Sequence, residues 1–186
     1  MNKKKIIILS IVLVLVVAYV SRVAYINIVE GPINVEQYSI GDKVKLCNYQ
    51  FQVDECQVLY LDEFEKKYGE LYDKEYKENN YVFIIVKMNY KMLTDKYNKK
   101  YDFSLADFKI QYKAIASDFD LDIFNYITSS DYHPVEKPGD CTTVYLPYAI
   151  AKPNITEEHW KNIKNLDFKL SINNAENKKI EVNLKK

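Results

Sequence analysis

Residues 81–93 read Tyr-Val-Phe-Ile-Ile-Val-Lys-Met-Asn-Tyr-Lys-Met-Leu, and no other stretch of the chain indicates a β-strand as strongly. The first half is apolar at consecutive positions, which is typical of a central strand buried on both faces. The second half alternates polar and apolar residues with the period of a strand. The sequence therefore predicts a long strand in the middle of a β-sheet.

Alternating apolar and polar residues predict further strands on both sides of this segment. Pro147 lies within one of them and favours a position at a sheet edge, because proline cannot donate a ladder hydrogen bond. About seven strands of this length are typical of an antiparallel β-sandwich. The six additional strands are predicted at residues 44–46, 49–60, 109–113, 141–150, 166–172 and 179–184.

Two short helices are predicted between the strands. Residues 61–69 form the first, with Asp62 as a possible N-cap and Gly69 as a C-cap. Thr156 can cap a second helical turn that runs to Ile163. The predicted fold class is therefore mainly β, with two short helices.

The N-terminal segment is predicted to be a membrane anchor. Lys3, Lys4 and Lys5 precede a largely apolar run from Ile6 to Val29. These 24 residues exceed the roughly 20 that a helix needs to cross a bilayer. Lysines before the helix stay in the cytoplasm, so a single-pass topology with an extracytoplasmic C-terminal domain is expected.

The same segment also permits a cleaved signal peptide, with residues 6–18 as its apolar region. Such a peptide needs small residues at positions −3 and −1 before the cleavage site. The candidate pairs after Ala18 do not satisfy this requirement, which favours an uncleaved anchor. The predicted organisation is an anchor over residues 1–29, a linker over 30–41 and a folded domain over 42–186.

The composition argues against several function classes. The chain carries 26 basic and 26 acidic residues, and Arg22 is the only arginine. Four of the basic residues and none of the acidic ones precede residue 30, so the remainder is net acidic. A nucleic-acid partner is not expected, since such sites rely on arginine and a basic face. No phosphate-binding loop or hydrolase motif occurs, and neither enzymatic activity nor a cofactor is predicted.

Three alternating carboxylates form the first candidate site. Asp118, Asp120 and Asp122 could provide oxygen ligands for Ca²⁺. The EF-hand pattern fails, because Ile123 stands where glycine is required and Ser129 where glutamate is required. The alternative is an amphipathic segment with solvated acids, and no metal site is predicted.

The three cysteines offer two further hypotheses. Cys47 and Cys56 could form a disulfide across the predicted hairpin in an oxidising compartment. The alternative is that all three cysteines are buried thiols that pack as small apolar residues. Cys141 and His133 could also form a thiol–imidazole pair, although a spacing of eight residues is a weak signal.

Aromatic residues form the last candidate set. A flat platform for sugars or peptides is one interpretation, and packing in the core or at a sheet edge is the other. The aromatic residues concerned are Tyr68, Tyr72 and Tyr76, together with Tyr145, Tyr148 and Trp160.

The order of these elements resembles a known group of domains. Five segments carry the resemblance: Ile40–Val44, Val82–Tyr90, Asp102–Phe108, Lys137–Asp140 and Thr142–Leu146. Over about residues 38–185 the chain is similar to exported, membrane-anchored, immunoglobulin-like (telokin-like) domains of unknown function from Gram-positive bacteria, the DUF5028 and DUF4352 groups. The resemblance implies an extracytoplasmic immunoglobulin-like β-sandwich and brings no catalytic residues.

These observations lead to two hypotheses of function. The first is a non-enzymatic, membrane-tethered domain that binds a protein or a cell-envelope component. The second is an accessory subunit that packs on another membrane protein through residues 6–29. In both hypotheses the cell membrane is one partner, and the protein or envelope ligand is unidentified.

Overall fold

The computed structural model describes residues 3–29, 34–94, 104–128, 135–174 and 178–185. The chain divides into two compact units, Met1–Asn34 and Val35–Lys186. Each unit is described by itself below.

The first unit is the helix α1, Lys3–Val29. Its side chains are described for residues 11–25, and they are exposed. In the described part of the chain, no helix combines the length and the apolar character needed to cross a membrane.

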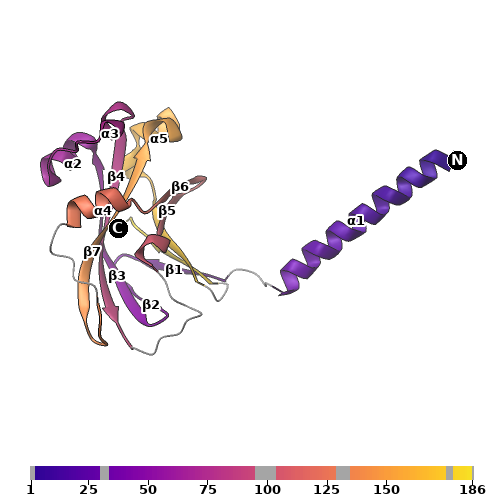
Figure 1. Ribbon diagram of the computed structural model, residues 1–186, viewed down its shortest axis with the longest axis horizontal. Helices are drawn as coiled ribbons and strands as arrows, with labels where there is room; N and C mark the ends of the chain where they lie inside the picture. The colour runs from indigo at the N-terminus through magenta and orange to yellow at the C-terminus, as the bar shows by residue number, and fades with distance from the viewer. Residues whose placement is uncertain (1–2, 30–33, 95–103, 129–134, 175–177, 186) are drawn as a thin grey trace. The chain divides into compact units, whose positions relative to one another are not determined.

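The second unit contains two β-sheets (Figure 1). One has the strand order β2-β3-β4-β7 and the other the order β1-β9-β8-β5-β6. The six strand pairs with a defined register are all antiparallel. The strands are β1 (Asn34–Ser39), β2 (Lys43–Leu46), β3 (Tyr49–Tyr60), β4 (Tyr81–Met92), β5 (Lys109–Tyr112), β6 (Ile115–Asp118), β7 (Cys141–Ala151), β8 (Lys169–Asn174) and β9 (Lys178–Asn183).

Short helices connect the strands. The α-helices are α2 (Leu61–Tyr68), α3 (Lys74–Glu78), α4 (Leu121–Thr128) and α5 (Glu157–Lys161). The 3₁₀ helices are η2 (Leu105–Asp107), η3 (Lys152–Asn154) and η4 (Ile163–Asn165). Helices α2 and α5 correspond to the two predicted helices, whereas α3 and α4 were not predicted.

The prediction of a mainly β fold with antiparallel sheets is confirmed. The predicted strand at residues 81–93 is β4, which pairs with β3 on one side and β7 on the other. Strand β7 lies at the edge of its sheet, as Pro147 indicated. The described residues contain nine strands rather than seven. The additional strands are β6 and β1, and β1 lies within residues 30–41, where a linker was expected.

The main core fills the space between the two sheets. Alternate side chains of β4, from Val82 to Met88, contribute to it from one sheet. The second sheet contributes Ile110, Leu170 and Val182, each almost completely buried. Burial of apolar area on both inner faces is the main source of stability in such a two-sheet fold.

A β-bulge in β3 changes which of its residues face this core. The register with β4 shifts between Val53 and Glu55. Phe51 and Val53 face the core before the bulge, and Val58 packs against it after the bulge. The odd-numbered side chains of β3 therefore point into the main core before the bulge and away from it after the bulge. As a result, Leu59 packs on the outer face of the sheet.

Candidate functional site

The outer face of the β2-β3-β4-β7 sheet is divided into two halves that differ in chemistry. Along β4 the outward positions alternate with the core positions, and the first three, Tyr81, Phe83 and Ile85, belong to a second hydrophobic cluster. The following outward positions are Lys87, Asn89 and Lys91. Figure 1 shows α2, α3 and α4 gathered at the end where β4 begins. We call the region around Phe83 and Ile85 the covered half.

A second hydrophobic cluster fills the covered half. Phe64 of α2 is fully buried and packs against Phe83, with ring centroids 4.4 Å apart. Ile123 of α4 and Leu71 are almost completely buried in the same cluster. The helices therefore convert this part of the outer face into a small separate core.

Hydrogen bonds at the rim hold α4 in place. The Asp120 carboxylate accepts a bond of 2.9 Å from the Ile123 amide, which is the geometry of an N-cap. Its other oxygen accepts a bond of 3.0 Å from the Tyr76 hydroxyl. Burial raises the pKa of Tyr76, and the negative charge of Asp120 raises it further. Asp120 thus links the residues before β4 to the start of α4.

Gly69 marks the point where α2 ends and α4 approaches. It is the C-cap residue, as the sequence predicted, and its φ of 105° is a conformation that favours glycine. A Cβ atom at this position would lie 2.7 Å from the hydroxyl oxygen of Tyr126. Tyr126 itself donates a hydrogen bond of 3.1 Å to the carbonyl of Glu70. The absence of a side chain here allows the tyrosine to close over the helix end.

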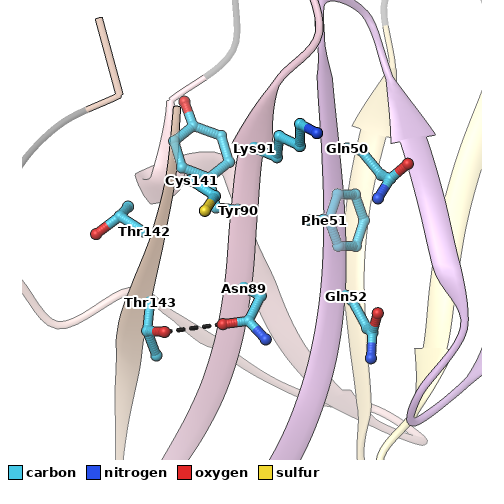
Figure 2. A pocket seen from close by; sticks show the side chains of 9 residues that line it. All are labelled: Gln50, Phe51, Gln52, Asn89, Tyr90, Lys91, Cys141, Thr142 and Thr143. Carbon is cyan, nitrogen blue, oxygen red and sulfur yellow. Dashed lines mark hydrogen bonds between the residues drawn. The ribbon is translucent and has the colours of Figure 1, made fainter. Parts of the chain in front are cut away.

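On the remaining part of the outer face, none of the described helices forms such a cover, and there is a hollow of about 560 Å³. Figure 2 shows its lining side chains on three adjacent strands. We call this region the open half. Its lining residues are Gln50, Phe51 and Gln52 of β3, Asn89, Tyr90 and Lys91 of β4, and Cys141, Thr142 and Thr143 of β7.

A row of hydrogen bonds crosses the strands beside the hollow. The Thr143 hydroxyl donates a bond of 2.8 Å to the Asn89 side-chain oxygen (Figure 2). The Asn89 amide donates a bond of 2.7 Å to Asp54, which also accepts a longer bond of 3.4 Å from Gln52. These contacts fix the orientation of the polar side chains, so the open half presents an ordered surface.

Other groups of the open half remain available to a ligand. Among the residues that the structure describes, no carboxylate pairs with Lys91, and no side chain bonds the amide group of Gln50. The hollow therefore combines one ammonium group with amide and hydroxyl groups. This set can bind a neutral polar ligand, or one that bears a negative charge near Lys91.

The comparisons with known proteins identify the family. A model of a domain of unknown function, DUF5028, matches residues 35–179. The chain belongs to the DUF5028 family. The match runs from β1 to the first residues of β9 and includes all the residues of the open half. No curated protein sequence matches the chain.

Three solved structures resemble this DUF5028 protein. A conserved hypothetical protein of Bacillus anthracis shares 14% identity, with a TM-score of 0.43, over 72% of this chain and 87% of that one. The YjhA protein of Bacillus subtilis shares 12% identity, with a TM-score of 0.45, over 80% and 99% of the two chains. A functionally unknown protein of Listeria monocytogenes shares 14% identity, with a TM-score of 0.47, over 72% and 71%.

The aromatic residues considered for a platform are dispersed over this DUF5028 domain. Tyr148 is fully buried in the main core, which removes it from any exposed surface. Trp160 packs against the main core beside Tyr60. Tyr68 and Tyr76 pack at the rim of the covered half. The two exposed ones are Tyr72, 89% exposed, and Tyr145, 37% exposed.

The three carboxylates considered for Ca²⁺ have separate roles. Asp118 forms an ion pair of 2.7 Å with Lys109. Asp120 caps α4, and Asp122 lies in the first turn of that helix. Within the described residues, no group of three acidic, histidine or cysteine side chains could hold a metal ion. The alternative of an amphipathic segment around residues 118–122 agrees with helix α4. Asp120 was not identified from the sequence as the N-cap of this helix.

The cysteines do not occupy the predicted positions. Cys47 lies in the turn between β2 and β3, whereas Cys56 stands opposite Val86 of β4, so the hairpin does not align the two for a disulfide. Burial raises the pKa of Cys56 to about 12. Cys47 and Cys141 are exposed, which also contradicts the alternative of three buried thiols. His133, the suggested partner of Cys141, lies outside the described residues.

Proposed function

We propose that this DUF5028 protein is a non-enzymatic binding module that is tethered to the cell membrane through residues 6–29. The domain faces the outside of a Gram-positive cell and has an immunoglobulin-like fold. It binds a protein or another component of the cell envelope through the open half of the outer sheet face.

The division of the outer face is the observation that carries this proposal. Helices bury the covered half under an apolar cluster, while the open half of the same strands retains a polar hollow. A sheet face that only stabilised the fold would gain nothing from groups such as Lys91 and Gln50, for which the described residues provide no side-chain partner. Adjacent strands provide a rigid base for such groups, which reduces the entropy lost on binding.

Sequence features support the tether. Lys3–Lys5 precede 24 residues that are mostly apolar, and the described side chains of α1 are exposed. Apolar side chains on all sides of a helix are typical of a segment surrounded by lipid. The two antiparallel sheets with a shared core support the immunoglobulin-like fold.

Photo-crosslinking of the full chain in intact cells tests the binding surface. A photoreactive residue replaces Lys87, the outward position of β4 next to Asn89, or, as the control, Lys66, which is exposed on α2. We expect discrete crosslinked products from position 87 and none from position 66. The absence of products from position 87, or the same products from both positions, would contradict the proposal.

Protease treatment of intact cells and of protoplasts tests the topology. We expect release of peptides from residues 35–186, with the N-terminal segment retained in the membrane fraction. Protection of these peptides in protoplasts that remain sealed would place the domain in the cytoplasm and overturn this part of the proposal.

A further inference from the structure

Strand β7 differs from the other three edge strands of the two sheets. Strand β2 contains Lys43 and Lys45, β1 contains Glu36, and β6 contains Asp118. Charged residues on edge strands oppose pairing with another chain. Strand β7 reads Cys-Thr-Thr-Val-Tyr-Leu-Pro-Tyr-Ala-Ile-Ala and carries no charge over 11 residues.

The direction of the backbone groups of β7 follows from two contacts. The carbonyl of Pro147 accepts a bond of 3.0 Å from the Asp120 amide, and the carbonyl of Ala149 accepts one of 3.0 Å from the Ser117 hydroxyl. These odd-numbered residues therefore direct their backbone groups away from β4. Since successive residues alternate, Cys141, Thr143 and Tyr145 direct theirs to the same open edge.

The open part of this edge is short. Residues 117–120 occupy the edge at Pro147 and Ala149. No hydrogen bond from the described residues reaches the outward groups of residues 141, 143 and 145. Among the described residues nothing thus caps the edge over residues 141–145, and Thr143 lies at its centre.

We propose that this edge pairs with the same edge of a second copy of the chain. The two β7 strands run antiparallel about a two-fold axis at Thr143. Each Thr143 then faces its equivalent, and each Cys141 faces Tyr145 of the second copy. All outward N–H and C=O groups of the five residues obtain partners in this register.

The chemistry of the strand favours a second copy as the occupant. An uncharged strand does not repel itself, and like charges directly opposite one another, which would destabilise the pair, are absent from residues 141–145. With the two-fold axis at Thr143, the two strands pair over all five open residues, 141–145. The paired stretch ends before Pro147, where residues 117–120 occupy the edge. Tyr145 of the second copy would stand beside Cys141, which lines the hollow, and would extend the open half across the two-fold axis.

The interface is small, so the association is expected to be weak in dilute solution. Interfaces below about 1,200 Å² are typical of transient contacts. Confinement of two copies to one membrane raises their effective concentration and favours the pair. The test therefore uses membranes that contain the full chain.

Disulfide crosslinking measures the register. The background chain carries Cys47→Ser and Cys141→Ser, and copper phenanthroline oxidises the membranes. Directly opposed residues in a hydrogen-bonded antiparallel pair have Cα atoms about 5.5 Å apart, within the range of a disulfide. We expect Thr143→Cys to form covalent dimers and Tyr145→Cys to form none. Restoring Cys141 in the Tyr145→Cys chain should restore the dimers.

A proline at the axis provides the second test. Thr143→Pro removes an outward N–H and leaves the pairing with β4 intact, as Pro147 already does in the same strand. In the Tyr145→Cys chain with Cys141 restored, we expect Thr143→Pro to reduce the yield of covalent dimer at least tenfold. Thr143→Val, which lacks only the hydroxyl, should retain that yield. Thermal unfolding of the variants verifies that each remains folded.

Three results would overturn the proposal. The first is the absence of a dimer from Thr143→Cys. The second is an equal yield of dimer from Thr143→Cys and from Lys66→Cys on α2, which would indicate random collision. The third is a set of crosslinks from position 143 to other proteins without a homodimer, which would assign the edge to another partner.

Discussion

The two halves of the outer sheet face are built on the same three strands, yet they have opposite chemistry. In the covered half, Phe83 and Ile85 lie beneath α2 and α4 and are buried. In the open half, Asn89 and Lys91 of the same strand line a polar hollow. The helices thus add buried apolar contacts at one end, and the other end keeps the polar surface for which we propose a binding role. Substitutions in the two halves should therefore separate stability from binding.

The largest effect is expected from the centre of the covered half. Phe64→Ala removes a fully buried ring that contacts Phe83 and leaves a cavity beneath α2. Substitutions of this kind cost about 3–5 kcal/mol of unfolding free energy. Urea denaturation measures the loss, and Tyr72→Ala, at an exposed position, serves as the control with little change. Equal losses for the two variants would show that the helices do not form a core on this face.

A smaller loss is expected at the cap of α4. Asp120→Ala removes the bond to the Ile123 amide and the bond from Tyr76. The loss of an N-cap costs about 0.5–2 kcal/mol. Asp122→Ala, in the first turn of the same helix, is the matched control and should cost less. If both variants lose the same stability, Asp120 does not act as the cap.

The tyrosines of the covered half predict a dependence of stability on alkaline pH. Burial and Asp120 raise the pKa of Tyr76, so the folded protein retains this proton when the unfolded chain loses it. The contribution to stability is complete below the ordinary tyrosine pKa of about 10. It is lost as the pH rises from there toward the folded pKa. Denaturation at several pH values measures the decline, which Tyr76→Phe should make less steep; an unchanged slope would contradict this role.

The smallest effect on stability is expected in the open half. Asn89→Ala breaks hydrogen bonds to Thr143 and Asp54 at an exposed position, so the unfolding free energy should change by less than about 1 kcal/mol. Photo-crosslinking from position 87 should nevertheless decrease, because the ordered polar row is lost. A loss as large as that of Phe64→Ala would mean that the open half supports the fold.

The alternation in residues 81–93 was sufficient to predict the central strand and its mixed character. The apolar first half appears in the structure as burial on both faces, and the alternating second half as one exposed face. The sequence could not indicate that α2 and α4 would cover the first half, because that contact joins segments far apart in the chain. The hollow could not be predicted for the same reason, because its lining residues come from three strands that are far apart in the sequence.

For two candidate sites that the sequence left with open alternatives, the local periodicity already favoured one alternative. Tyr148 occupies an even position of β7, in phase with the buried Val144 and Leu146, and this alternation indicates the core. The acids around Asp120 suggested metal ligands, whereas the spacing of Ile123 and Ile127 on one helix face indicates that Asp120 precedes a helix. In both cases the period of the local structure was more informative than the residue type.

One variant can show whether binding and stability are separate on this sheet face: Gln50→Ala, Asn89→Ala and Lys91→Ala combined in one full chain with a photoreactive residue at position 87. Melting temperature and crosslinking yield in cells are measured on the same variant. We expect a melting temperature within a few degrees of the parent chain and the loss of the crosslinked products. A large decrease in melting temperature with unchanged products would contradict this expectation, since the open half would then stabilise the fold without contacting a ligand.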